Sequence, residues 1–366
     1  MKDSSLICVS MILKNEAHCI KLTTDSCKEH VDAWVVLDTG STDGTQDILR
    51  QELADKLELH EEPFVNFSVS RNRALDLCGQ KAEYILMLSA DEVVENPAAL
   101  RQFLATRRGE RGLQDEAYMV DVKFKGSMTY KSARVMRSWA KWRYVGATHE
   151  VLCRPGGNPD VLKVRGANIV FTGDSKNEGA YKFSRDVVLL TKEVEEDPSN
   201  SRSWFYLGMS YYWAGQNFHA MRCLDKRIAL GGWGEEVFIA KLTKARASCS
   251  LGISWSHCLE LYLQAYTQAP HRAEPLADVA KHYHQAEDHA CVVLFASCAF
   301  ALPYPSGDSL FVEDVVYSWV VADYLAIHAY YVGEFELGER AAAHALKLCP
   351  GDERMQRNLA HYLSRK

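Results

Sequence analysis

Residues 33–57, AWVVLDTGSTDGTQDILRQELADKL, place an apolar run, a polar turn and a helical pattern directly after one another. The run Ala33–Leu37 is short and bounded by polar residues, which is typical of a buried strand in a parallel sheet. Thr42 or Asp43 can cap a helix, and apolar residues follow at helical spacing: Ile48, Leu49, Leu53 and Leu57. The stretch therefore predicts a strand that leads into an amphipathic helix.

Two further apolar runs extend this pattern through the first half of the chain. Leu6–Leu13 precedes the opening stretch, and Glu83–Leu88 follows it. Strands that alternate with helices predict an α/β domain with a mainly parallel, Rossmann-like sheet. Ligands of such sheets bind at the carboxyl ends of the strands, so we expect Asp38 and the neighbours Asp91 and Glu92 along one rim.

The composition is that of an ordinary globular protein. The 366 residues are 47% hydrophobic and 25% charged, which favours two domains with separate cores. The net charge of −6 argues against nucleic acid as a partner. The N-terminal apolar run is too short for a signal peptide and no run is long enough to span a membrane, so we expect a cytoplasmic protein. None of the 11 cysteines forms a CxxC pair, which argues against a zinc cluster.

The second half of the chain has almost no strand signal and follows a 34-residue pattern. Its large, small and aromatic positions match a tetratricopeptide repeat at Trp204, Leu207, Gly208, Tyr211, Gly215, Ala220 and Leu224. We therefore predict an α/β domain over residues 1–178 and an all-α repeat domain over 179–366, with a linker near Gly173–Ala180. A generic helical bundle is the alternative. Such repeats form concave surfaces that bind peptides or partner helices, and this domain could also form a homodimer.

Five segments of the first half resemble family 2 glycosyltransferases with the GT-A fold. They are SMILKNEA (10–17), VVLDTGSTDGT (35–45), FVNFSVSRNRAL (64–75), LMLSADE (86–92) and RYVGATHEVL (143–152), in the order that the family has them. The resemblance covers roughly residues 6–172. The repeat half resembles the tetratricopeptide extension of a subset of these enzymes, including bacteriocin S-glycosyltransferases.

The resemblance implies a set of residues that bind the nucleotide sugar. Asp38 would accept hydrogen bonds from the base or the ribose, with a turn or capping role as the alternative. Asn15 and Glu16 would line the same pocket, with loop capping as their alternative. Arg71 would contact the base or the diphosphate, and an arginine near a helix start also suggests an anion nearby. Arg137 is a candidate for contacts with the donor phosphates or the acceptor.

The resemblance also implies a metal site and a catalytic base. Asp91 occupies the position of the metal-binding Asp in the family's Asp-x-Asp motif, but Ser89 replaces the first Asp, so dependence on Mn²⁺ or Mg²⁺ is open. His149 would approach the metal, and an imidazole ligand would favour Mn²⁺. Glu150 would be the general base. The alternative for His149 and Glu150 is a structural ion pair.

The resemblance implies an inverting glycosyltransferase. It would move a hexose from a nucleotide sugar, with UDP as the expected carrier, to a peptide or protein held by the repeats. Polysaccharide or lipid-linked acceptors are an alternative within the enzyme class. An interaction scaffold whose transferase domain has lost catalysis is the alternative outside it, and Ser89 favours that alternative. The sequence does not identify the sugar or the acceptor atom.

Overall fold

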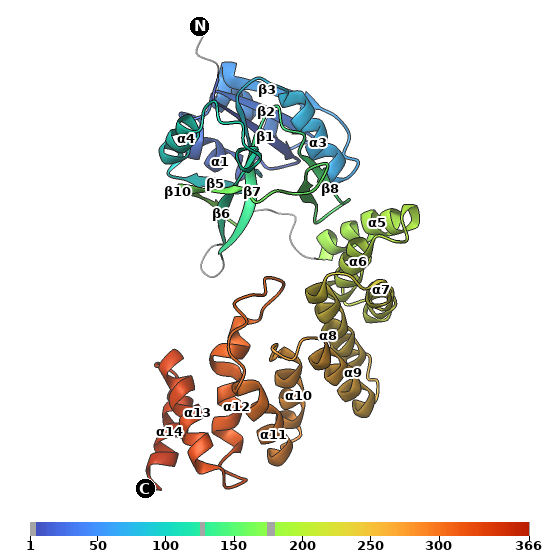
Figure 1. Cartoon of the computed structure of the whole chain (residues 1–366), viewed down its shortest axis with the longest axis vertical. Coiled ribbons are helices and arrows are strands. Elements are labelled where there is room, and N and C mark those ends of the chain that lie inside the picture. The colour runs from blue at the N-terminus through green and yellow to red at the C-terminus, as the bar shows by residue number, and fades with distance from the viewer. Residues whose placement is uncertain (1–4, 125–128, 174–179, 366) are drawn as a thin grey trace. The chain divides into compact units, whose positions relative to one another are not determined.

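The computed structural model describes residues 5–124, 129–173 and 180–365, and the chain forms two compact units, Met1–Lys182 and Phe183–Lys366 (Figure 1). Two domains were predicted from the sequence, and two units are found. The predicted boundary between residues 178 and 179 lies outside the described residues. Each unit is described by itself below.

The first unit is built on an eight-stranded sheet of order β3-β2-β1-β4-β7-β6-β10-β5. Strands β7 and β5 pair antiparallel with their neighbours and run against the other six, so the sheet is mainly parallel, as predicted. The strands are β1 (Ile7–Leu13), β2 (Ala33–Asp38), β3 (Leu57–Glu61), β4 (Tyr84–Met87), β5 (Glu92–Glu95), β6 (Ala117–Phe124), β7 (Thr129–Arg137) and β10 (Leu162–Phe171). A second, small sheet pairs β8 (Arg143–Val145) with β9 (Val151–Cys153).

Helices cover both faces of the large sheet because successive strand residues point to opposite sides. The helices are α1 (Ile20–Cys27), α2 (Thr45–Leu53), α3 (Phe67–Cys78) and α4 (Pro97–Thr106), with 3-10 turns η1 (Ala54–Lys56) and η2 (Leu113–Asp115). Val9, Trp34 and Leu86 pack in one core with α1, α2 and α4. Their strand neighbours pack in a second core with α3, for example Val35 and Ile85. Both faces are buried, which explains why these strands read as continuous apolar runs.

The starts of two helices bear on the predicted site residues. Helix α2 begins at Thr45 after Gly44, whose φ of 89° favours glycine, and Asp43 accepts from the Thr45 N–H at 3.1 Å. Helix α3 begins at Phe67, and the side chain of Asn66 accepts from the Val69 N–H at 2.8 Å. Arg71 therefore lies in the second turn of α3 and not at its start.

The second unit consists of helices that pair in sequence order. They are α5 (Ala180–Glu196), α6 (Ser201–Trp213), α7 (Asn217–Leu230), α8 (Gly234–Ser250), α9 (Trp255–Gln268), α10 (Glu274–Gln285), α11 (His289–Phe300), the π-helical turn η3 (Val316–Val320), α12 (Val321–His328), α13 (Phe335–Leu348) and α14 (Glu353–Leu363). Gly208 of α6 faces Leu224 of α7 so closely that an added Cβ would lie 2.7 Å from a Leu224 methyl carbon. Close approach of two helices at a small residue is what the repeat pattern predicts.

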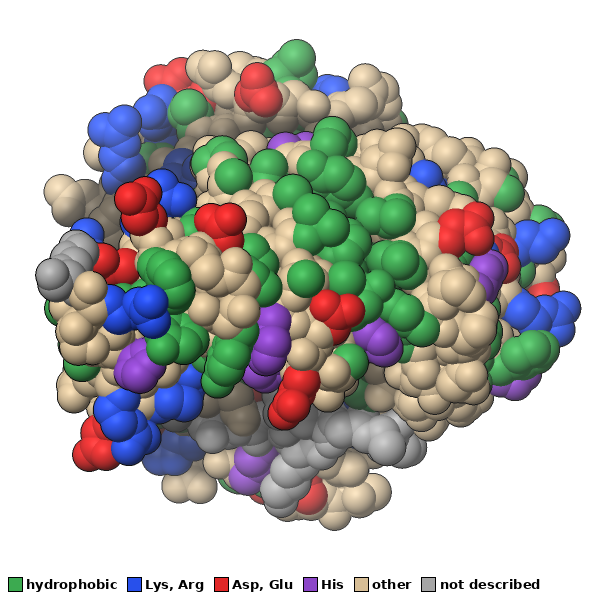
Figure 2. Space-filling view, turned by 90° about the horizontal axis from the view of Figure 1, so that it is seen from below, with side chains coloured by type: hydrophobic (Ala, Val, Ile, Leu, Met, Phe, Trp, Pro, Cys, Tyr) green, Lys and Arg blue, Asp and Glu red, His purple; other side chains and the backbone are tan. Residues whose placement is uncertain are grey.

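The surface of the second unit is partly apolar. Large side chains such as Phe218, Leu294 and Tyr331 are exposed. Figure 2, which views the molecule from below, shows hydrophobic side chains gathered in a band with histidines beside it. Across the described ranges, none of the helices has both the length and the apolar character needed to cross a membrane.

Candidate active site

Asp38 ends β2 as a buried carboxylate with one oxygen left over. Its Oδ1 accepts from the backbone N–H groups of Gly40 and Ser41, each at 2.7 Å, which shapes the turn after the strand. Its Oδ2 is also buried and has no hydrogen-bond partner among the residues the structure describes. A buried acceptor without a donor is costly, so this atom fits a ligand N–H or hydroxyl.

Asn15 and Glu16 lie beside this turn, in the loop that follows β1. The Asn15 N–H donates to Ser41 Oγ, and Asn15 Oδ1 accepts from the Thr42 N–H, both at 2.8 Å, so Asn15 makes the loop-capping contacts of its alternative role. Glu16 is buried, and its Oε2 accepts from the Cys19 thiol at 3.2 Å. One ligand atom each from Glu16, His18 and Cys19 lies within 4.8 Å of the others, a spacing that a metal ion would fit.

Asp91 lies in a turn that is fixed from two sides. Thr23 Oγ1 donates to the Ala90 carbonyl at 2.5 Å, and the N–H and hydroxyl of Thr172 both donate to the Asp91 carbonyl at 2.9 Å. Burial, and then the charges of Glu92 and Glu16, raise the pKa of the Asp91 carboxyl to about 6.

This turn has the chemistry of a cation site. In the described ranges Asp91 forms no ion pair, although three carboxylates lie close together there. A divalent cation would balance this charge, so the donor set fits Mn²⁺ or Mg²⁺. Ser89 brings no carboxylate; its N–H donates to Glu92 Oε2 at 2.8 Å.

Glu92, the residue after Asp91, forms a buried ion pair with Arg134 that the sequence did not predict. Arg134 donates to both carboxylate oxygens of Glu92 at 2.7 and 3.2 Å. Burial alone would lower the pKa of Arg134, but the charge of Glu92 and the nearby Tyr144 raise it above its usual value. No local sequence pattern predicts this contact, because β5 and β7 are not neighbours in the sheet.

A second ion pair joins two predicted site residues. Arg71 Nε donates to Glu150 Oε1 at 2.5 Å, and both side chains are mostly buried. Arg71 Nη1 is buried without a hydrogen-bond partner in the described part of the chain. The arginine therefore orients Glu150 and keeps a donor for an anionic ligand. The anion expected near Arg71 is, in this structure, the Glu150 carboxylate.

Tyr144 holds these groups together. The Asn72 side chain exchanges two 2.8 Å hydrogen bonds with the backbone of Tyr144, which ties α3 to β8. Arg71 lies over the Tyr144 ring at 5.5 Å. Burial raises the pKa of the Tyr144 hydroxyl, and Arg71 and Arg134 oppose that rise, so both ion pairs lie close to this ring.

His149 precedes Glu150 in the loop after β8. Its φ of 50° is in the left-handed region, where a side chain other than glycine is strained. The Ala147 carbonyl in the same loop accepts from the Phe67 N–H at 3.0 Å, so the loop is anchored to the start of α3. The loop that carries His149 and Glu150 is thus held by β8, which precedes it, and by the start of α3.

Arg137 does not join the other predicted residues. It is fully buried, forms an ion pair with Glu83, and donates to the carbonyls of Arg107 at 2.6 Å and Asp115 at 3.1 Å. It pairs with Tyr84 at the first residue of β4, at the opposite end of that strand from Asp91. The structure therefore corrects the predicted donor contact: Arg137 is an internal structural cation.

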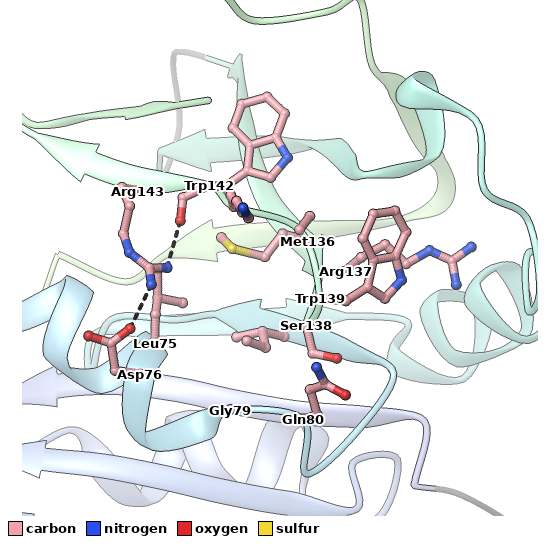
Figure 3. Close-up of a pocket in the computed structure, with 13 residues that line it drawn as sticks. Leu75, Asp76, Gly79, Gln80, Met136, Arg137, Ser138, Trp139, Trp142 and Arg143 are labelled. Atoms are coloured by element: carbon pink, nitrogen blue, oxygen red, sulfur yellow. Dashed lines mark hydrogen bonds and ion pairs between the residues drawn. The ribbon is translucent and has the colours of Figure 1, made fainter. Parts of the chain in front are cut away.

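A cavity of about 230 Å³ lies at this opposite end of β4 and not at the rim (Figure 3). Its wall includes Trp139, Trp142 and Ser138, and Arg143 crosses it to Asp76 at 2.7 Å. Trp142 is almost fully buried and belongs to the core on the α3 face. The cavity is not lined by Asp38, Arg71, Asp91 or Glu150.

Comparisons with known proteins identify a family for the first half of the chain. A sequence profile described as glycosyl transferase family 2 matches residues 8–142. The SPbeta prophage-derived glycosyltransferase SunS of Bacillus subtilis (strain 168) is 23% identical over 238 residues, which are 62% of this chain and 54% of that protein. The chain thus spans about half the length of the curated relatives it matches. A TPR repeat-containing protein of Synechococcus elongatus is 38% identical over 86 residues, 24% of this chain and 20% of that protein.

Solved structures give only distant likenesses. Staphylococcus aureus TarS has 12% identity and a TM-score of 0.37, and the match covers 68% of this chain and 53% of TarS. MamA has 16% identity and a TM-score of 0.34, over 49% of this chain and 98% of MamA. At such scores the fold rests on the strand order and helix pairing described above. Residues 8–142, which include Asp38, Arg71 and Asp91, are thus similar to family 2 glycosyltransferases, and a tetratricopeptide-like helical unit follows them.

Proposed function

We propose that this chain is an inverting glycosyltransferase that moves a hexose from a nucleotide sugar, expected to be a UDP-sugar, to an acceptor. One observation carries the proposal: Asp38, which has a buried acceptor oxygen, and Asp91 lie at or just after the carboxyl ends of β2 and β4, within the residues that match family 2 glycosyltransferases. The contact between Arg71 and Glu150 supports it. Similarity to a protein named a glycosyltransferase supports it.

The residues divide the chemistry among them. Asp38 Oδ2 would accept from the base or the ribose, and Arg71 Nη1 would donate to the diphosphate. The acceptor would attack the anomeric carbon opposite the diphosphate, the bond from that carbon to the leaving oxygen would break, and Glu150 would take the acceptor's proton. Arg71 Nε donates to Glu150. The same arginine would therefore contact both the general base, Glu150, and the leaving diphosphate.

The proposed cation is Mn²⁺ or Mg²⁺, held by Asp91 and His149. When bound, it would supply positive charge to the leaving diphosphate. Glu16 lies near enough to influence the Asp91 carboxyl, so this chain has a carboxylate beside Asp91 although Ser89 provides none. A peptide or protein acceptor held by the repeats, a homodimer formed through them, and a cytoplasmic location are further parts of the proposal, which rest on the sequence.

Calorimetry with UDP and UDP-sugars, with and without Mn²⁺, tests the proposal. Binding that Mn²⁺ strengthens is expected, and no binding under either condition would overturn it. The second experiment is donor hydrolysis by Glu150→Gln, expected to fall by about a hundredfold or more. Glu62→Gln is the matched control, because Glu62 pairs with Arg73 at 2.8 Å on the surface.

A scaffold that has lost catalysis is the second candidate, and one observation favours it: Ser89 stands where the first carboxylate of the motif is expected. A scaffold would bind no UDP-sugar, or would bind it with no difference in turnover between the wild type and Glu150→Gln. The two experiments above therefore separate the two functions.

A further inference from the structure

Residues 303–313, called the strap below, connect α11 to η3 without forming a helix or a strand. The strap lies against α6, α8 and the start of α10, which are the first helices of three successive pairs. Its partners there come from parts of the chain up to 106 residues away, as between Phe205 and Phe311. Because the strap and its partners are far apart in the sequence, their contact resembles one between a peptide and a receptor.

The receptor side contacts the main chain of the strap from two sides. Glu235 Oε2 accepts from the N–H groups of Ser309 and Leu310 at 2.8 and 2.7 Å. Arg272 donates to the carbonyls of Leu310 at 3.4 Å and Phe311 at 3.2 Å. One carboxylate and one guanidinium thus contact four main-chain polar groups of three consecutive strap residues, as in the recognition of extended peptides.

The strap also inserts specific side chains. Asp308 accepts from Arg272 Nη1 at 3.1 Å, and Glu313 accepts from Arg246 Nη1 at 2.6 Å. Leu310 is buried in the core of the second unit. The Phe311 ring lies 6.3 Å from Phe205 and 6.0 Å from Trp213. The contacted pattern, over residues 308–313, is Asp, Ser, Leu, Phe, Val, Glu, with acidic ends and an apolar centre.

The two arginines of the receptor side are also held by residues outside the strap. Arg272 is fully buried and is bound to Glu274 by contacts of 2.7–3.1 Å. Arg246 Nε is held by Asp278 at 2.6 Å, which leaves Nη1 for the strap. Preorganised donors of this kind bind a ligand at a low cost in entropy.

The strap, in contrast, is strained and partly exposed. Phe311 has a φ of 47°, which is unfavourable for a residue with a Cβ, and its side chain stays 42% exposed. Displacing the strap would relieve this backbone strain. Of the strap and the receptor side, the strap is therefore the part that another segment can replace.

We propose that residues 308–313 are a peptide ligand bound in cis, and that the surface formed by Phe205, Trp213, Glu235, Arg246 and Arg272 binds separate protein segments that displace it. The partner is a segment with an Asp, a Leu-Phe pair beginning two residues later, and a Glu two residues after the pair. This inference goes beyond the proposed function, because it requires no nucleotide sugar and no transfer.

The test uses a synthetic peptide of residues 303–314 with a fluorescent label, measured by anisotropy against the full chain. The wild-type strap competes at high effective concentration, so Leu310→Ala/Phe311→Ala in the protein should raise peptide affinity by about tenfold or more. Asp308→Ala in the protein is a second, milder variant that leaves Leu310 in the core. A folded variant that binds the peptide no better than the wild type would overturn the proposal.

Two comparisons make the result specific. Trp213→Leu in the weakened chain should reduce affinity for the native peptide, but not for a peptide that carries Phe311→Ala, since these two rings contact each other. A scrambled peptide should not bind, and equal binding by it would contradict the inference. A wild-type dimer that Leu310→Ala/Phe311→Ala dissolves would assign the strap to a second copy of the chain, and would also overturn it.

Discussion

Asp91 combines a fixed backbone with a buried carboxylate that forms no ion pair within the described ranges, although the charge of Arg134 partly offsets that of its acidic neighbours. Its pKa is raised from 3.8 to about 6, first by burial and then by Glu92 and Glu16. An acid with a higher pKa when folded binds more protons in the folded state between those two values. The folded state is therefore destabilised as pH rises through this window, and the effect is complete above it.

Asp91→Asn should consequently stabilise the first unit at pH 7.5, by about 1–3 kcal/mol, while it abolishes the effect of Mn²⁺ on donor binding. At pH 4 the gain in the free energy of unfolding should be close to zero. Urea unfolding in the absence of metal measures the free energy of unfolding at both pH values. Asp47→Asn is the control, because that residue is exposed and pairs with Arg50 at the surface. Equal loss of stability at both pH values would contradict the interpretation.

The two carboxylate oxygens of Asp38 have different roles. Oδ1 accepts hydrogen bonds from the turn after β2, and Oδ2 can accept one from a ligand. Asp38→Asn keeps one acceptor for the N–H groups of Gly40 and Ser41 and replaces the second oxygen by a donor. UDP affinity should fall by about 10- to 100-fold, because a base N–H or ribose hydroxyl would then face an N–H group. Calorimetry measures the affinity, and an unchanged thermal midpoint shows that the turn is intact. Unchanged UDP affinity would remove Asp38 from the site.

The two carboxylates were predictable from local sequence, and the two ion pairs were not. Asp38 and Asp91 follow apolar runs, and the carboxyl ends of parallel strands share one rim. The partners Arg71 and Glu150 are 79 residues apart, so no local spacing signals their contact. Arg137 was misplaced because β7 runs antiparallel to β4, which carries its last residue to the opposite edge of the sheet.

At the level of elements, the repeat pattern predicted the helix pairs because its small residues lie where two helices pack closely. A Cβ on Gly208 would meet both the side chain and the backbone nitrogen of Leu224, at 2.7 and 3.4 Å. Gly208→Ala should therefore cost about 1–3 kcal/mol in the free energy of unfolding of the second unit. Gly234→Ala, at a helical glycine with open space around it, should be neutral or slightly stabilising. Equal effects of the two substitutions in urea unfolding would exclude close packing as the cause.

A cluster of three histidines gives the same unit a dependence on acid. His328 of α12 contacts His284 Nδ1 at 2.7 Å and His289 Nδ1 at 2.8 Å. Burial, and then these two histidines, lower the pKa of His328 from 6.5 to about 4. Between those values the unfolded chain binds the proton and the folded chain does not, so stability falls as pH drops from 6.5 to 4.

The second unit should lose up to about 3 kcal/mol over that window through His328. His328→Gln should flatten this part of the pH profile, and His257→Gln, at an exposed position, should not. Urea unfolding followed by circular dichroism at several pH values measures both profiles. A profile that keeps its slope in His328→Gln would assign the acid sensitivity to other groups.

For the whole molecule, the sequence predicted two units because the apolar pattern changes from strands to helical repeats near residue 180. It did not predict the strap, whose partners are set by the stacking of helices and not by any pattern within residues 303–313. The structure adds that each buried core lies within one unit: the sheet cores use residues 6–169, and the helical cores begin at Leu190.

Separate cores predict separate unfolding. Scanning calorimetry of the full chain should show two transitions. UDP with Mn²⁺ should raise only the transition of the first unit, by an amount that follows RT ln(1 + [L]/Kd), because the proposed ligand contacts lie within the sheet unit. Lowering the pH from 6.5 toward 4 should lower the transition of the second unit through His328, and that shift should disappear in His328→Gln. A single transition that UDP and His328→Gln both shift would show that the units unfold as one, and would exclude this independence.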